Sequence, residues 1–177
     1  MLSQLAHLAL SEGRTADART ACDAVREILE DLPDEARPFI TAGLGWRAVA
    51  DGDASGLALM EESVSSAKVR GEKYDLSYML AILGAGRLAT NNRVGAHPAY
   101  EEALQLAEEG GNPWDRANAL EGLAACLVLC GEDSGETARL LLKAEALRKE
   151  IGGVRPPAYE WIANIARRSA RPGLDSA

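Results

Sequence analysis

The stretch Leu83-Gly84-Ala85-Gly86-Arg87-Leu88-Ala89-Thr90-Asn91 carries the pattern that decides the fold, because that pattern recurs along the chain. Its markers are a Leu followed by a small residue, and a Gly or Asn eight positions after the Leu. They recur at Leu5-Ala6 with Gly13, at Leu44-Gly45 with Gly52 and at Leu123-Ala124 with Gly131. The leucines are at positions 5, 44, 83 and 123, so successive copies begin 39, 39 and 40 residues apart. A fixed period in this range is typical of a stacked helical solenoid.

Apolar residues at three- and four-residue spacing between the breaks predict a single all-α array over residues 1–177. We expect a right-handed solenoid of four helix pairs, covering about residues 1–31, 35–70, 74–109 and 113–151. The second helix of the third pair is expected to begin at Pro98, because a proline in the first turn loses no hydrogen bond. A last helix at about residues 158–170 has no partner of its own and is expected to cap the final apolar face.

The first helix pair is shorter than the others. Its first helix has about ten residues before the turn at Gly13, and an apolar face with Leu2, Leu5 and Leu8 has nothing before it for cover. Soluble monomers avoid such apolar patches. Either the chain is a segment of a longer protein, or a second copy covers this pair in a homodimer.

The charge and the apolar pattern exclude several classes of partner. The formal net charge is −8 and the pI is about 4.9, which argues against a surface that follows nucleic-acid phosphates. No stretch of about 18 apolar residues is present to span a membrane, and the N-terminus lacks the pattern of a secretory signal. Three cysteines outside a disulfide-dense setting favour reduced thiols. We therefore expect a cytoplasmic protein that binds neither nucleic acid nor membrane directly.

The sequence offers no site for catalysis, a cofactor or a metal. Gly84-Ala85-Gly86 falls inside a helical pattern and lacks the Gly-Lys-Ser/Thr of a phosphate-binding loop. Cys126 and Cys130 are four residues apart on one helix, but His7 and His97 are far from them in sequence, so buried apolar cysteine is the favoured interpretation. No nucleophile elbow appears. The chain is therefore predicted not to be an enzyme.

The first helices of the pairs carry the candidate binding residues, since the resemblance of this period to tetratricopeptide-type stacks implies that first helices line the concave face. The predicted partner groove consists of Phe39, Trp46, Tyr78, Arg87, Asn118 and Glu121. Aromatic side chains beside small residues would form a groove for an apolar helix or peptide, and Arg87 and Arg47 would hold an acidic group of the partner. Packing between repeats would account equally well for Phe39, Trp46 and Tyr78.

The period, the Leu-Gly pairs and the turn glycines resemble the tetratricopeptide repeat, with a period about five residues longer than the usual one. The C-terminal part is similar to the closing repeat of large bacterial regulators that carry an ATPase module, of the LuxR and antibiotic-regulatory-protein types. The matching positions are Trp114, Ala119 to Ala124, Ala138 to Leu141, Ala144 to Arg148, Ile151-Gly152 and Pro156-Pro157. This resemblance implies a segment that receives a protein, peptide or small effector and restrains a transcriptional regulator. The alternative is a freestanding scaffold or dimerisation protein unrelated to transcription.

Overall fold

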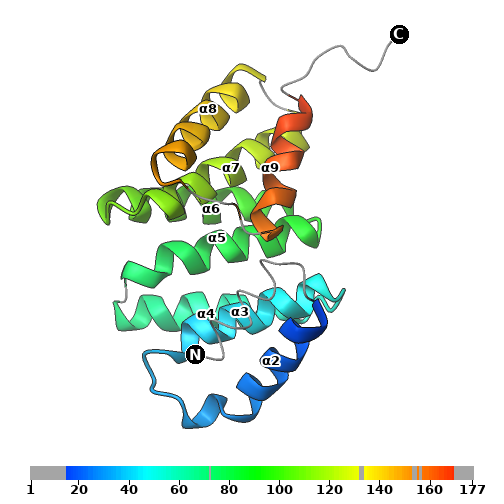
Figure 1. Cartoon of the computed structure of the whole chain (residues 1–177), viewed down its shortest axis with the longest axis vertical. Helices are drawn as coiled ribbons and strands as arrows, with labels where there is room; N and C mark the ends of the chain where they lie inside the picture. The colour runs from blue at the N-terminus through cyan, green and yellow to red at the C-terminus, as the bar shows by residue number, and fades with distance from the viewer. Residues whose placement is uncertain (1–14, 72, 132–133, 153–154, 156, 170–177) are drawn as a thin grey trace.

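The computed structural model describes residues 15–71, 73–131, 134–152, 155 and 157–169. All the regular structure in these residues is helical, and the helices pack in sequence as adjacent pairs (Figure 1). The helices are α2 (Thr15–Glu27), the 3-10 turn η1 (Leu29–Asp31), α3 (Arg37–Ala50), α4 (Gly56–Arg70), α5 (Lys73–Ala89), α6 (Arg93–Glu109), α7 (Pro113–Cys130), α8 (Ser134–Glu150) and α9 (Pro157–Ser169). The predicted all-α helical-repeat fold is confirmed.

The turn markers of the sequence repeat adopt a left-handed backbone. Gly52 has a φ of 87°, Asn91 of 63° and Gly131 of 73°. Gly and Asn are the residues that reach this conformation at the lowest steric cost, and they commonly end helices. The repeated Gly or Asn therefore ends the first helix of each described pair.

The small residue after the repeated Leu lies where two helices approach closely. A Cβ atom on Gly45 would come within 2.5 Å of the carbonyl oxygen of Gly56, on the partner helix α4. A Cβ atom on Gly84 would come within 2.7 Å of the Tyr100 ring, on the partner helix α6. Both glycines therefore permit the contact between the two helices of one pair.

Each helix from α3 to α8 packs on the next, and the first helix α5 also contacts the first helices α3 and α7. One continuous apolar core runs from α3 to α9, as expected when neighbouring pairs share their buried faces. Its fully buried side chains include Met60, Met79, Tyr100 and Ile162. Helix α2 packs apart from this core, through a small cluster of Cys22, Val25 and Leu44.

The last helix exists as predicted but covers an unexpected surface. Helix α9 packs mainly on the first helix α7, contacts α8 less and reaches α5 (Figure 1). In the body of the stack, α5 and α7 instead pack extensively on the second helices that precede them, α4 and α6. Helix α9 therefore lies on the side of the first helices and does not continue the repeat.

Two helix boundaries differ from the sequence-based prediction. The prediction that α6 begins at Pro98 is wrong, because this proline lies inside a helix that begins at Arg93. The Asn92 side chain caps that helix by accepting a hydrogen bond from the Gly95 N–H at 3.0 Å. The helix after Thr15 ends at Glu27, and a 3-10 turn occupies the rest of the predicted span. The predicted helix of about residues 1–11, with Leu2, Leu5, Leu8 and the dimer contact proposed for them, lies outside the described residues.

Candidate partner-binding face

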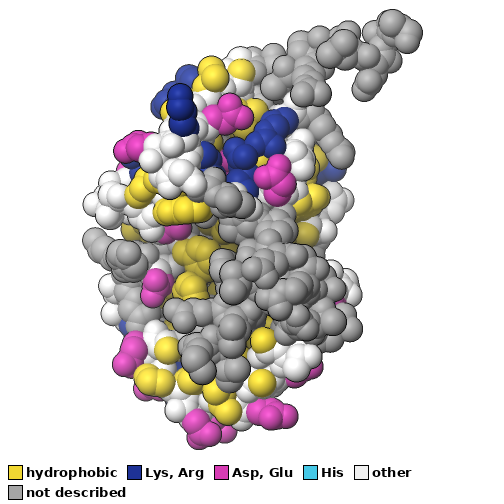
Figure 2. Space-filling view, viewed as in Figure 1, with side chains coloured by type: hydrophobic (Ala, Val, Ile, Leu, Met, Phe, Trp, Pro, Cys, Tyr) yellow, Lys and Arg dark blue, Asp and Glu magenta, His cyan; other side chains and the backbone are white. Residues whose placement is uncertain are grey.

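All six residues of the predicted groove lie on first helices. They are Phe39 and Trp46 on α3, Tyr78 and Arg87 on α5, and Asn118 and Glu121 on α7. We call the side of α3, α5 and α7 that carries Phe39, Trp46, Tyr78, Asn118 and Glu121 the first-helix face. In Figure 2, a group of hydrophobic side chains is visible near the middle of the surface, and Lys and Arg gather toward the α8 and α9 end.

The aromatic part of this face spans two consecutive repeats. The rings of Phe39 and Tyr78 stack with their centroids 5.1 Å apart and their planes at 22°. These two residues are 39 positions apart, so the repeat itself brings them together. Trp46, one helical heptad after Phe39, is half-buried and packs against the main core.

A notch lies between the two aromatic side chains of α3. Phe39, Gly43 and Trp46 are at i, i+4 and i+7, so they share one side of the helix. A Cβ atom added to Gly43 would meet no atom within 4 Å, which shows open space at this position. The sequence-based prediction missed Gly43, although a helical glycine between two aromatic residues is a recognisable signal.

The two arginines predicted to hold an acidic partner group make internal contacts. Arg87 donates from Nη1 to the Gly95 carbonyl and pairs through Nη2 with Glu61, both at 2.9 Å, so it joins α5 to α6 and α4. Arg47 is buried and forms a two-pronged ion pair with Asp51 on its own chain segment. Neither guanidinium group is presented for a partner in this structure.

Asn118 and Glu121 belong to a buried ion cluster. Glu121 is 0% exposed, and its carboxylate contacts Arg148 Nη2 at 3.0 Å and Arg155 Nε at 2.6 Å. Arg148 Nη2 also donates to Asn118 Oδ1. The Arg148 guanidinium lies 5.4 Å from the centre of the half-exposed Trp114 ring, a cation–π arrangement. This cluster fastens α8 and the segment before α9 to α7, and it buries both predicted groove residues.

The sequence held a signal for this cluster. Glu121 is the one charged residue between Ala117 and Cys126, and every residue of this span of α7 is buried. A buried carboxylate is stable only when it is paired and hydrogen-bonded. Glu121 therefore required basic partners, which only the folded chain identifies as Arg148 and Arg155.

Three tyrosines from three different helices converge between α5 and α7. The Tyr100 ring of α6 lies between Gly84 and Gly122. Tyr78 and Tyr100 also act on Tyr159 of α9, whose pKa they raise beyond the effect of burial. Burial is the main cause of the raised pKa of all three phenols. The hydroxyl groups of Tyr100 and Tyr159 are buried without a hydrogen-bond partner among the described residues.

A buried carboxylate joins α5 to α7 beside these tyrosines. Asp115 Oδ2 accepts hydrogen bonds from Ser77 Oγ at 2.6 Å and from Asn112 Nδ2 at 2.9 Å. Burial raises the pKa of Asp115, the Ser77 hydrogen bond opposes that shift and Asp75 adds to it. Because both hydrogen bonds are internal, Asp115 serves to hold two first helices together.

The described residues contain neither a side-chain cluster for a metal ion nor a helix suited to span a membrane. No group of three or more His, Cys, Asp or Glu side chains in this part of the chain is placed to hold a metal ion. Cys126 is buried, with its pKa raised to about 12 by desolvation, while Cys130 is exposed. In the same part of the chain, no helix is both long and apolar enough to cross a membrane.

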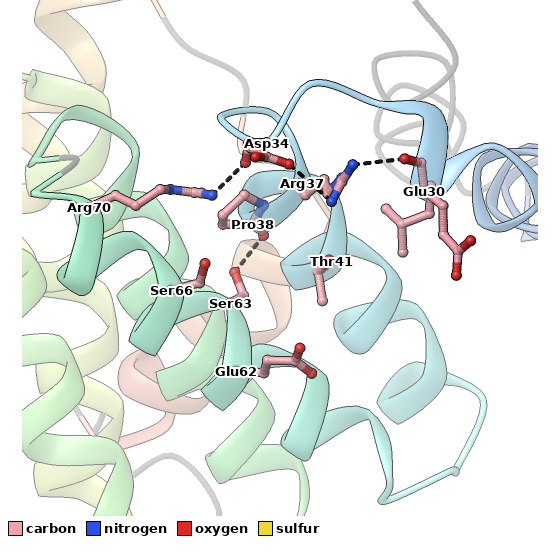
Figure 3. Close-up of a pocket in the computed structure, with 10 residues that line it drawn as sticks. Glu30, Asp34, Arg37, Pro38, Thr41, Glu62, Ser63, Ser66 and Arg70 are labelled. Carbon is pink, nitrogen blue, oxygen red and sulfur yellow. Dashed lines mark hydrogen bonds and ion pairs between the residues drawn. The ribbon is translucent and has the colours of Figure 1, made fainter.

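A polar pocket of about 310 Å³ lies where the segment before α3 meets α4 (Figure 3). Arg37 donates to the Glu30 carbonyl at 2.7 Å and pairs with the Asp34 carboxylate at 3.0 Å. Arg70 approaches from the other side and donates to the Asp34 carbonyl at 2.6 Å. Both arginines bind oxygens of the chain itself, so these contacts hold the segment before α3 against α3 and α4. The sequence-based prediction missed it because the contacts join residues up to 36 positions apart.

Comparisons with protein-family models, with curated proteins and with solved structures found no match for this chain.

Proposed function

We propose that this chain is a non-catalytic interaction segment of a bacterial transcriptional regulator, and that it receives its partner on the first-helix face. The observation that carries the proposal is the aromatic notch on α3. Phe39, Trp46 and Tyr78 are each half-buried, and the space above Gly43 is open. Aromatic side chains with exposed area commonly dominate the energy of protein interfaces.

The regulatory role rests on the resemblance of residues 113–171 to the closing repeat of ATPase-linked regulators, and the acidic charge supports it. A net charge of −8 opposes direct contact with DNA, so a partner or effector would act through protein contacts. The second candidate is a freestanding scaffold, which the same notch would also serve.

Photocrosslinking tests the proposed face. A photoreactive p-benzoylphenylalanine at position 43 should capture a partner protein in lysate of the native host. The same group at Val69, which is 86% exposed on the second helix α4, is the matched control and should not capture it. In the position-43 variant, the further change Trp46→Ala should reduce capture at limiting concentration, because truncating an interface aromatic costs about 1 kcal/mol or more. Equal capture from positions 43 and 69 would refute the proposed face.

The size of the native protein separates the two candidates. An antibody against this segment should detect a protein much larger than 18.8 kDa in the host if the segment belongs to a large regulator. A native protein of about this mass would instead support the freestanding scaffold.

A further inference from the structure

We propose that α9 is a replaceable occupant of the first-helix face, and that the partner is an amphipathic helix that docks on α5 and α7 where α9 now lies. The inference rests on the proposed function and specifies its partner and its regulation. Helix α9 would then control access to the part of the face formed by α5 and α7.

The position of α9 is the first argument. A further repeat would place its first helix against the second helix α8, as α5 lies against α4 and α7 against α6. Helix α9 instead packs mainly on α7 and reaches α5. It therefore occupies the surface that stacked first helices leave for a ligand.

The contact surface of α9 has the pattern of a helical ligand. Tyr159, Ile162, Ala163 and Ala166 are buried, and they are spaced at i, i+3, i+4 and i+7. This spacing is the one by which an amphipathic helix docks into a groove. The opposite side carries Asn164 and the 40% exposed Trp161. The face thus accepts a helix with an aromatic first anchor and small or branched residues behind it.

Polar groups at Tyr159 and at residues that act on it electrostatically are buried without partners among the described residues. The hydroxyl groups of Tyr159 and Tyr100 and the Nη1 atom of Arg148 are buried and form no hydrogen bond among the described residues. Burying an unsatisfied donor costs free energy. A partner helix that lacks the Tyr159 hydroxyl, or that brings an acceptor to Arg148, would therefore bind this surface better than α9 does.

A short electrostatic tether holds α9 in place. Arg155 lies just before the helix and pairs with Glu121 of α7 at 2.6 Å. The Nη1 atom of Arg155 lies 3.9 Å from the Glu160 carboxylate of α9, and that carboxylate also pairs with Arg167 at 3.1 Å. Glu121 keeps Arg148 as a partner when Arg155 is lost, so Arg155→Gln weakens the tether without leaving an unpaired buried carboxylate.

A labelled peptide with the sequence of residues 157–169 is the probe, and its binding to the full chain is measured by fluorescence anisotropy. The affinity should rise about fivefold or more in Arg155→Gln, because the apparent affinity scales with the fraction of molecules whose face is open. Tyr159→Phe, which removes the unsatisfied hydroxyl from the resident helix, should lower it. Arg139→Gln removes the same charge from an exposed pair with Glu136 on α8 and should leave the affinity unchanged.

Hydrogen exchange provides the second measurement. Amides of α9 should exchange faster than those of α6 and α7, and faster again in Arg155→Gln, while the circular dichroism signal stays helical. If α9 amides exchange as slowly as those of α6 in every variant, or Arg155→Gln binds the peptide no better than Arg139→Gln, the proposal is wrong. Dimers of Arg155→Gln that exchange α9 would identify a second copy as the occupant and overturn the partner-helix assignment. The crosslink from position 43 is independent of α9, so these failures leave the proposed function standing.

Discussion

Gly122→Ala gives the sharpest test of how the helices are packed. A Cβ atom at position 122 would overlap the Tyr100 ring on one side, and the ring cannot retreat because Gly84 holds its other side. A Cβ atom on Gly84 would already lie within 2.7 Å of the ring. Tyr100 is fully buried, so no solvent-exposed position is open to it without movement of α6.

The expected loss of stability follows from two opposing effects. Replacing a helical Gly by Ala favours the helix by about 1 kcal/mol. Overpacking a close-packed core costs about 1–3 kcal/mol and occasionally more. Because the added atom overlaps a ring clamped between two helices, we expect the upper part of that range and a net destabilisation of about 1–2 kcal/mol. For a chain of this size, that corresponds to a fall in Tm of about 2–8 °C.

Urea and thermal unfolding, followed by circular dichroism, measure this effect. Gly43→Ala is the matched control, since a Cβ atom there meets nothing within 4 Å and the substitution should stabilise α3. Combining Gly122→Ala with Tyr100→Leu should lessen the penalty, because the smaller side chain leaves room for the added methyl group. A Gly122→Ala protein at least as stable as the wild type would refute the packing described here.

Three further predictions concern buried polar groups. The pKa of Asp115 is raised in the native protein, so its protonated form stabilises the fold at a pH below the ordinary pKa of 3.8. This contribution is lost as the pH rises through the native pKa. Asp115→Asn should therefore remove this part of the pH dependence of stability, as urea unfolding from pH 3 to 7 can measure. Tyr100→Phe should leave the free energy of unfolding unchanged or increase it, because the hydroxyl it removes is buried and unpaired; a loss above about 1 kcal/mol would show a hidden hydrogen bond. In the native protein, iodoacetamide should modify Cys130 rapidly and Cys126 slowly, as mass spectrometry of digests can show, whereas equal rates would mean that α7 opens readily.

The helical repeat was predictable because its markers have local physical causes. Gly52, Asn91 and Gly131 end helices through their own backbone conformation, which depends little on distant parts of the chain. Gly45 and Gly84 recur because the two helices of their pairs approach each other closely at this position. Such requirements repeat with the structure and are therefore visible as a period.

The candidate site was predictable only in part. Equal positions in successive repeats placed Phe39 and Tyr78 on neighbouring helices, and the structure stacks their rings. The same counting put Asn118 and Glu121 on α7, but it could not show that Arg148 and Arg155 bury them. The role of these two residues as part of an exposed groove is therefore replaced by one in an internal cluster.

The sequence by itself determined the all-α class, the helix pairs and the positions that share a helix face, because these follow from local backbone preference and apolar periodicity. Only the tertiary structure decided which of those faces remain open. Helix α9 lies on α7 and α5, and Arg87 turns toward Glu61 and Gly95, because contacts between residues distant in sequence compete for each surface. The energies of these contacts depend on distances and burial that arise only when the whole chain packs, so the notch at Gly43 and the occupied surface beneath α9 could be told apart only in the folded protein.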